Sequence, residues 1–156
     1  MSDKIDFARN VIKGKIAEQV FEFMFRSVDQ YDVIPFGYEY SQPQLAQHIN
    51  LLKEKNLLDT LRNTPDFLLI SKDKSQAYYV EVKYRKILDD EEVKTLAQNL
   101  VNKWNHAFLF IATPEGFYSS ACHDILNKGK IDKLQEWIVP TESQNKYLQL
   151  LNEFEK

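Results

Sequence analysis

Two carboxylates and one lysine have the types and spacing that could support hydrolysis of a phosphodiester bond. Asp66 follows a Thr-Pro pair, and Glu81 and Lys83 stand two residues apart further along the same segment. Two neighbouring carboxylates repel each other unless a proton or a cation joins them, and Mg²⁺ is commonly held by one or two carboxylates with waters and a phosphate oxygen. A lysine beside such an ion could orient or help to deprotonate the attacking water. The alternative for these charges is the solvated rim of a hairpin.

The segment 64–85 has the pattern of two β-strands joined by a charged turn, and this pattern predicts where the three side chains lie. Side chains alternate along a strand, so Val80 and Val82 face the core while Glu81 and Lys83 are presented together on the opposite face. Because an antiparallel hairpin returns to its starting edge, Asp66 is expected beside this pair.

A third acid stands in the first predicted helix, over residues 5–28. Glu18 interrupts an apolar row of that helix, with Gly14 one turn before it. Burying a carboxylate costs free energy unless something pairs with it. Two interpretations stay open: Glu18 lies at the partly exposed edge of the apolar stripe, or it points at the sheet and joins the other acids.

The remaining elements predict an α/β fold with a central mixed sheet flanked by helices in three layers. Further strands are expected at 32–40, 107–113 and 117–121, and further helices at 43–55, 89–104, 125–137 and 141–154. The length of 156 residues predicts a single domain over 1–156, with a core at about 5–121 and C-terminal helices at about 122–156.

Composition limits the class of protein. The net charge of −3 argues against generic nucleic-acid binding, because phosphate contacts need Lys and Arg, although it leaves room for a local basic strip. The single cysteine, Cys122, excludes an intrachain disulfide and fits a reducing compartment. The N-terminus lacks the pattern of a signal peptide, and no apolar run is long enough to span a bilayer. We therefore expect a cytoplasmic protein that does not contact membranes.

The stretches TPDFL and VEVK, which contain Asp66, Glu81 and Lys83, resemble the PD-(D/E)xK signature of the restriction-endonuclease-like nuclease superfamily. They resemble in particular its branch of transposon-end-cleaving and resolvase-type nucleases. The resemblance covers roughly residues 10–113 and implies the three-layer restriction-endonuclease-like fold. It also implies a nuclease that depends on Mg²⁺ or Mn²⁺, with an endonuclease acting on DNA as the expected activity. Many relatives act as homodimers, and this arrangement stays open.

The resemblance also implies a role for each site residue. Asp66 and Glu81 would bind the metal, with the Val82 carbonyl as a further ligand, and Lys83 would serve the attacking water. Glu18 would bind or orient a second metal or its water, because the first helix of the family commonly carries an acid.

Residues outside the signature could complete the site. Several branches of the superfamily place a Gln followed by a Tyr on the next helix; Gln98 lies on such a helix, but Asn102 stands where the Tyr would be. Gln98 at the site and Gln98 on a solvated surface therefore both stay open. Candidates for phosphate contact are the basic residues Lys13, Lys15, Arg85 and Lys86, each of which could equally be an ordinary solvated side chain.

Two other classes of function compete with the nuclease. One is a catalytically silent nuclease-like domain that binds nucleic acid or a protein partner. The other is an unrelated interaction domain in which the acids are exposed surface charges. Metal titration separates the nuclease from the unrelated domain, and a cleavage assay separates it from the silent one.

Overall fold

The computed structural model describes residues 2–35, 65–104 and 106–154. The predicted helix at 43–55 and the predicted strand beyond residue 35 lie outside these ranges. The elements in chain order are α1 (Ser2–Ser27), β1 (Tyr31–Pro35), β2 (Phe67–Ser71), β3 (Ala77–Tyr84), α5 (Asp90–Val101), β4 (Ala107–Thr113), β5 (Gly116–Ala121), α6 (Cys122–Lys128) and α7 (Thr141–Glu153).

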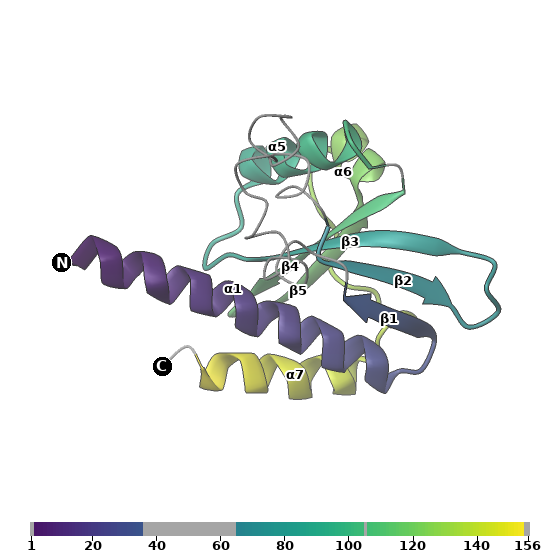
Figure 1. Cartoon of the computed structure of the whole chain (residues 1–156), viewed down its shortest axis with the longest axis horizontal. Helices are drawn as coiled ribbons and strands as arrows, with labels where there is room; N and C mark the ends of the chain where they lie inside the picture. The colour runs from purple at the N-terminus through teal and green to yellow at the C-terminus, as the bar shows by residue number, and fades with distance from the viewer. Residues whose placement is uncertain (1, 36–64, 105, 155–156) are drawn as a thin grey trace, which may run out of the picture.

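The five strands form one mixed sheet in the order β1-β2-β3-β4-β5. Neighbouring strands run antiparallel except β3 and β4, which are parallel. The connection from β3 to β4 passes through α5, as a parallel pair requires. Helices α1 and α7 lie on one side of the sheet and α5 and α6 on the other (Figure 1). The predicted three-layer α/β architecture is confirmed.

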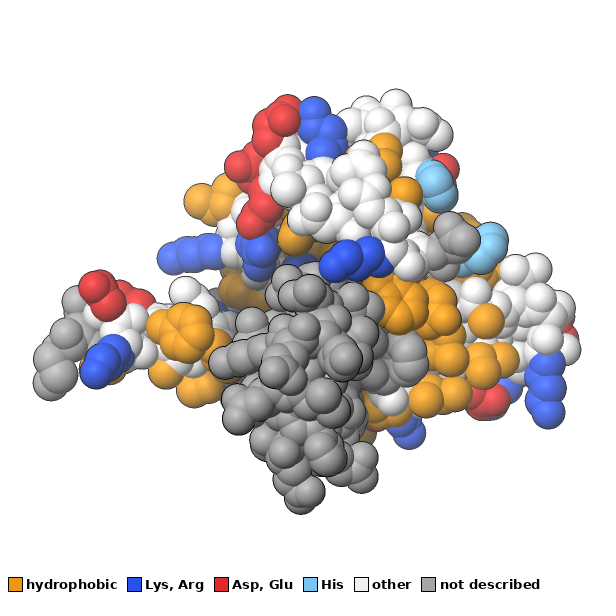
Figure 2. Space-filling view, turned by 45° about the horizontal axis from the view of Figure 1, so that its top comes forward, with side chains coloured by type: hydrophobic (Ala, Val, Ile, Leu, Met, Phe, Trp, Pro, Cys, Tyr) orange, Lys and Arg blue, Asp and Glu red, His pale blue; other side chains and the backbone are white. Residues whose placement is uncertain are grey.

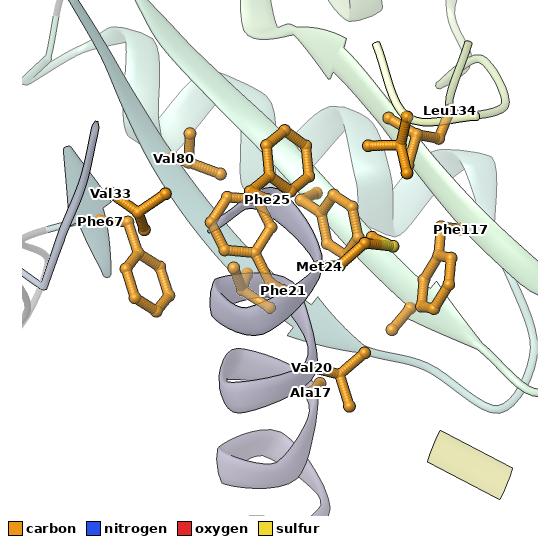
Figure 3. Close-up of a cluster of buried hydrophobic side chains, with 14 of the residues drawn as sticks. Ala17, Val20, Phe21, Met24, Phe25, Val33, Phe67, Val80, Phe117 and Leu134 are labelled. Carbon is orange, nitrogen blue, oxygen red and sulfur yellow. The ribbon is translucent and has the colours of Figure 1, made fainter. Parts of the chain in front are cut away.

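The first core lies between the sheet and the helices α1 and α7. Phe21, Met24 and Phe25 of α1 are buried against apolar side chains from every strand (Figure 3). The rings of Phe21 and Phe25 stack with their centroids 4.4 Å apart. Each such buried side chain stabilises the fold by about 1.5–3 kcal/mol. This cluster therefore fixes the rotation of α1 about its axis, and with it the direction of Glu18, which is adjacent to the buried Ala17.

The second core lies on the opposite face of the sheet. Val93 and Ala97 of α5, Leu109 and Ile111 of β4, and Ile125 of α6 are fully buried there. The face of β3 that carries Glu81 is thus covered by helices. Both faces of the central strands are buried, which is typical of parallel pairing.

The helix predicted over 125–137 is wrong beyond residue 128. Helix α6 ends at Gly129, which adopts a left-handed φ of +80° and donates its backbone N–H to the Ile125 carbonyl. The following segment runs along β5: the Leu134 N–H donates to the Phe117 carbonyl, and Lys133 forms an isolated bridge with Tyr118. Pairing with the edge strand satisfies backbone groups that a longer helix would have satisfied internally.

No helix within residues 2–35, 65–104 and 106–154 has both the length and the apolar character that a bilayer crossing needs.

Candidate active site

Asp66 lies just before β2, at the point where the ladder between β2 and β3 ends. The last backbone pair of that ladder is Phe67 with Val80. Beyond that pair, Oδ2 of Asp66 accepts a hydrogen bond of 2.8 Å from the backbone N–H of Val82. The carboxylate therefore takes the place of a backbone acceptor, and its side chain is buried between the two strands. Pro65 before it is buried as well and holds the chain at this position.

Glu81 meets Asp66 at this position. Burial raises the pKa of the Glu81 carboxyl well above its usual range, and a hydrogen bond to Asp66 and the negative charges of Asp66 and Glu18 raise it further. Lys83 acts in the opposite direction, with its Nζ 3.8 Å from Glu81 Oε2. The structure thus brings the two acids and the lysine together, as the hairpin pattern predicted. The Glu81 carboxyl is stable there when a proton or a cation balances its charge.

Glu18 approaches the site from α1. It is half-buried and lines a groove together with Val82 and Lys83, so it points towards the sheet, and its charge reaches Glu81. Within residues 2–35, 65–104 and 106–154, no group of three or more His, Cys, Asp or Glu side chains is arranged to hold a metal ion. Asp66 and Glu81 are therefore a carboxylate pair, with Glu18 further away across the groove.

The groove has a volume of about 590 Å³ and lies between the N-terminal half of α1 and the end of β3. It collects the four residues predicted to contact phosphate and adds Lys83. The lining residues in the described part of the chain are Asn10, Val11, Lys13, Gly14, Lys15, Glu18, Val82, Lys83, Tyr84, Arg85 and Lys86. In Figure 2, Lys and Arg side chains lie above the end of α1 that projects at the left of the view and below a group of acidic side chains near the top. A chain with a net charge of −3 thus concentrates positive charge beside its carboxylate pair.

Two of the cationic side chains in the groove have neighbours that hold them in place. Arg85 Nε donates to Glu92 Oε1 at 2.8 Å, which ties the end of β3 to the first turn of α5. Lys13 Nζ lies 5.7 Å from the centroid of the Tyr84 ring, a cation–π geometry. Arg85 therefore has a structural partner inside the protein, in addition to any contact it makes with a ligand.

Gln98 is not brought to the site. It is exposed, and its Nε2 donates to Asn102 Oδ1 at 2.9 Å on the surface of α5. Its neighbour Asn99 lines a cavity of about 90 Å³ against Glu81 and Lys83, between Leu96 and Leu100. Asn99 was not predicted as a site residue. It is exposed, as Gln98 is, but it lies about one helical turn after Leu96, which lines the same cavity.

The geometry agrees with a comparison of the chain with known families. Residues 31–110, just over half of the chain, match the model of the TnsA-like endonuclease N-terminal domain. The matched region contains Asp66, Glu81 and Lys83, whereas Glu18 precedes it and α7 follows it. No curated protein matches the chain.

Proposed function

The chain belongs to the TnsA-like endonuclease N-terminal family of PD-(D/E)xK nucleases, and we propose that it is a Mg²⁺-dependent endonuclease that cuts DNA. One observation carries this proposal. Asp66, Glu81 and Lys83, the three residues of the signature, meet where the ladder between β2 and β3 ends. A silent relative has no need to keep a buried pair of acids beside a lysine, because such a pair opposes folding unless a cation or a proton balances it.

The donor set fits a hard divalent cation. Asp66 and Glu81 offer carboxylate oxygens, and Mg²⁺ is usually held by one or two carboxylates together with waters and substrate phosphate oxygens. Burial and the negative charge of Asp66 raise the pKa of Glu81, so a cation beside the two carboxyl groups could take the place of a proton. Asp66 and Glu81 would hold the ion, with the Val82 carbonyl as a further ligand. A bound divalent ion supplies Lewis-acid stabilisation of the charge that develops on the phosphate.

The side chains around this pair perform the remaining steps. Lys83, whose side chain is about one-third exposed, orients the attacking water and places positive charge beside the phosphate. Glu18 lies across the groove from Lys83 and orients the water or holds a second ion. The remaining Lys and Arg side chains of the groove bind the phosphates that flank the scissile bond.

We also propose that residues 1–156 act as one nuclease-like domain. Helices α1 and α7 lie outside the matched region, yet they pack on one face of the sheet and share its first core. Without them the apolar residues of that face would be open to water. The activity is therefore expected from the whole chain.

A cleavage assay with point variants tests the function. The purified chain is incubated with duplex, single-stranded and branched DNA and with matched RNA, in Mg²⁺, Mn²⁺ or chelator. We expect cutting of at least one DNA form with metal and none with chelator. Asp66→Ala and Lys83→Ala should each lose activity by about a hundredfold or more, because each removes a group that stabilises developing charge. Glu18→Gln should lose less.

Lys130→Ala provides the matched control for Lys83→Ala, because Lys130 is exposed and does not line the groove. It should cut as well as the wild type. A wild-type chain that cuts none of the substrates with either metal, or a Lys83→Ala variant as active as Lys130→Ala, would contradict the proposed function.

A further inference from the structure

Gly14 stands in the middle of α1, where glycine is an unfavourable residue. Glycine loses more conformational freedom in a helix than alanine does, so it weakens the helix. A helical glycine usually has a structural reason, either a neighbour that leaves no room for a Cβ or a positive φ. Among the described residues neither reason applies, because a Cβ added at Gly14 would meet none of their atoms within 4 Å and the φ of Gly14 is not positive. The described fold does not require glycine at this position.

The open space above Gly14 belongs to the basic groove. Gly14 lines this groove, and Lys13 and Lys15 flank it on the helix. Glu18 stands one turn further along α1, towards the carboxylate pair. The opposite wall is the end of β3, with Lys83 and the residues that follow it. A side chain at position 14 would project into this groove, a passage along α1 whose opposite wall holds Lys83 of the signature.

We infer that Gly14 keeps this passage open for the phosphodiester backbone of the substrate, which lies on α1 beside it as it enters the site. The lining chemistry selects this occupant: five of the eleven described lining residues are Lys or Arg, and one is acidic. Cations spaced along a groove match the repeated charge of a nucleic-acid strand. The inference rests on the proposed function, because it takes the substrate to be a nucleic acid. Gly14 is a positioning residue, and it takes no part in the chemistry.

Two substitutions separate the effect of Gly14 on substrate binding in the groove from its effect on the stability of the fold. Gly14→Ala should raise the melting temperature by about 2–4 °C, because alanine favours the helix and meets no clash. It should weaken binding only slightly. Gly14→Met adds a long unbranched side chain that also favours helix, so it should melt no lower than the wild type. Its affinity for DNA should fall by about tenfold or more, which corresponds to about 1.4 kcal/mol.

The measurement is the anisotropy of labelled DNA and RNA duplexes of one sequence, in low salt with Ca²⁺ to prevent cutting. Ala8→Met is the matched control, because Ala8 is exposed on the same helix and does not line the groove. It should bind as the wild type does. If Gly14→Met loses affinity equally for the DNA and the RNA duplex, the groove recognises the backbone that the two share. If it loses affinity for DNA alone, the groove selects DNA. Both results support the inference.

Two results would overturn the inference. One is a wild-type chain that binds neither duplex. The other is a Gly14→Met variant that binds as tightly as Ala8→Met; if its mass in sedimentation is then altered, this face of α1 is assigned to a second copy of the chain.

Binding and cutting are measured separately, so the two proposals can fail separately. If the wild type binds DNA, Gly14→Met binds it weakly and no substrate is cut, the proposed nuclease function is wrong and the inferred role of Gly14 is supported. If the wild type cuts DNA and Gly14→Met binds and cuts it equally well, the inferred role of Gly14 is wrong and the nuclease function is supported.

Discussion

Glu81 carries the strongest electrostatic conflict described in the site. In the folded chain its pKa lies well above the ordinary value of 4.5, first because of burial and then because of Asp66. Below pH 4.5 the carboxyl is protonated in both the folded and the unfolded chain, and its contribution to stability is complete. As the pH rises above that value, the unfolded chain releases the proton first, so the metal-free folded state loses stability until the folded pKa is passed.

Glu81→Gln should remove this pH dependence, because glutamine cannot ionise and its amide can still donate to Asp66. In chelator we expect the variant and the wild type to melt at similar temperatures near pH 4. Near pH 8 the variant should be more stable by on the order of 1 kcal/mol, a few degrees in melting temperature. Glu136→Gln, at an exposed position, is the control and should follow the wild type at both pH values. A difference between Glu81→Gln and the wild type that does not change with pH would show that Glu81 ionises normally.

At the scale of the element, the end of α6 depends on one backbone conformation. Gly129 has a φ of +80°, which side chains with a Cβ rarely adopt, so Gly129→Ala should destabilise the fold by about 1 kcal/mol. Gly129→Asn should cost less, because asparagine tolerates the left-handed region. Thermal melts measure both variants. Gly129→Ala should lower the melting temperature, whereas Gly14→Ala should raise it, although both changes replace a glycine in or next to a helix by alanine.

Cleavage by Gly129→Ala should stay at the wild-type level, because Gly129 does not line the groove. An unchanged melting temperature would mean that the helix can end at another residue without loss. A loss of activity without a loss of stability would connect α6 to the site.

At the scale of the whole molecule, Asp66 precedes β2 while Glu81 lies in β3, and the two acids meet only in the folded chain. A metal ion held by this pair would therefore bind the folded state alone. It should raise the melting temperature as its concentration rises, by about 2.7 kcal/mol of stability at a hundred times Kd. Asp66→Asn should respond much less, because it removes one carboxylate of the pair. Melts with chelator and with a series of Mn²⁺ concentrations measure this. Equal metal responses of the two proteins would show that the acids do not form a metal site.

The hairpin and its three signature residues were predictable from the sequence because their determinants are local. Alternation along the strand places Glu81 and Lys83 on one face, and the short turn returns the chain to Asp66. The apolar period of α1 marked its buried face only in part: Phe21 and Met24 are buried, whereas Phe7, Ile12 and Phe23 of the same apolar rows are exposed. The period also left Glu18 with two interpretations. Family membership followed from the same local stretches, TPDFL and VEVK, which lie inside the matched region.

Only the tertiary structure decided how distant segments meet. The parallel pairing of β3 with β4 places α5 over the face of Glu81, and it selects Asn99 rather than Gln98 to line the adjoining cavity. Pairing with β5 replaces the second half of a predicted helix. The packing of α1 across the sheet brings Glu18 into one groove with Lys83 and joins two separate basic stretches in that groove. These outcomes depend on which apolar faces of distant segments pack against each other. The periodicity of a single segment carries no information about its packing partner.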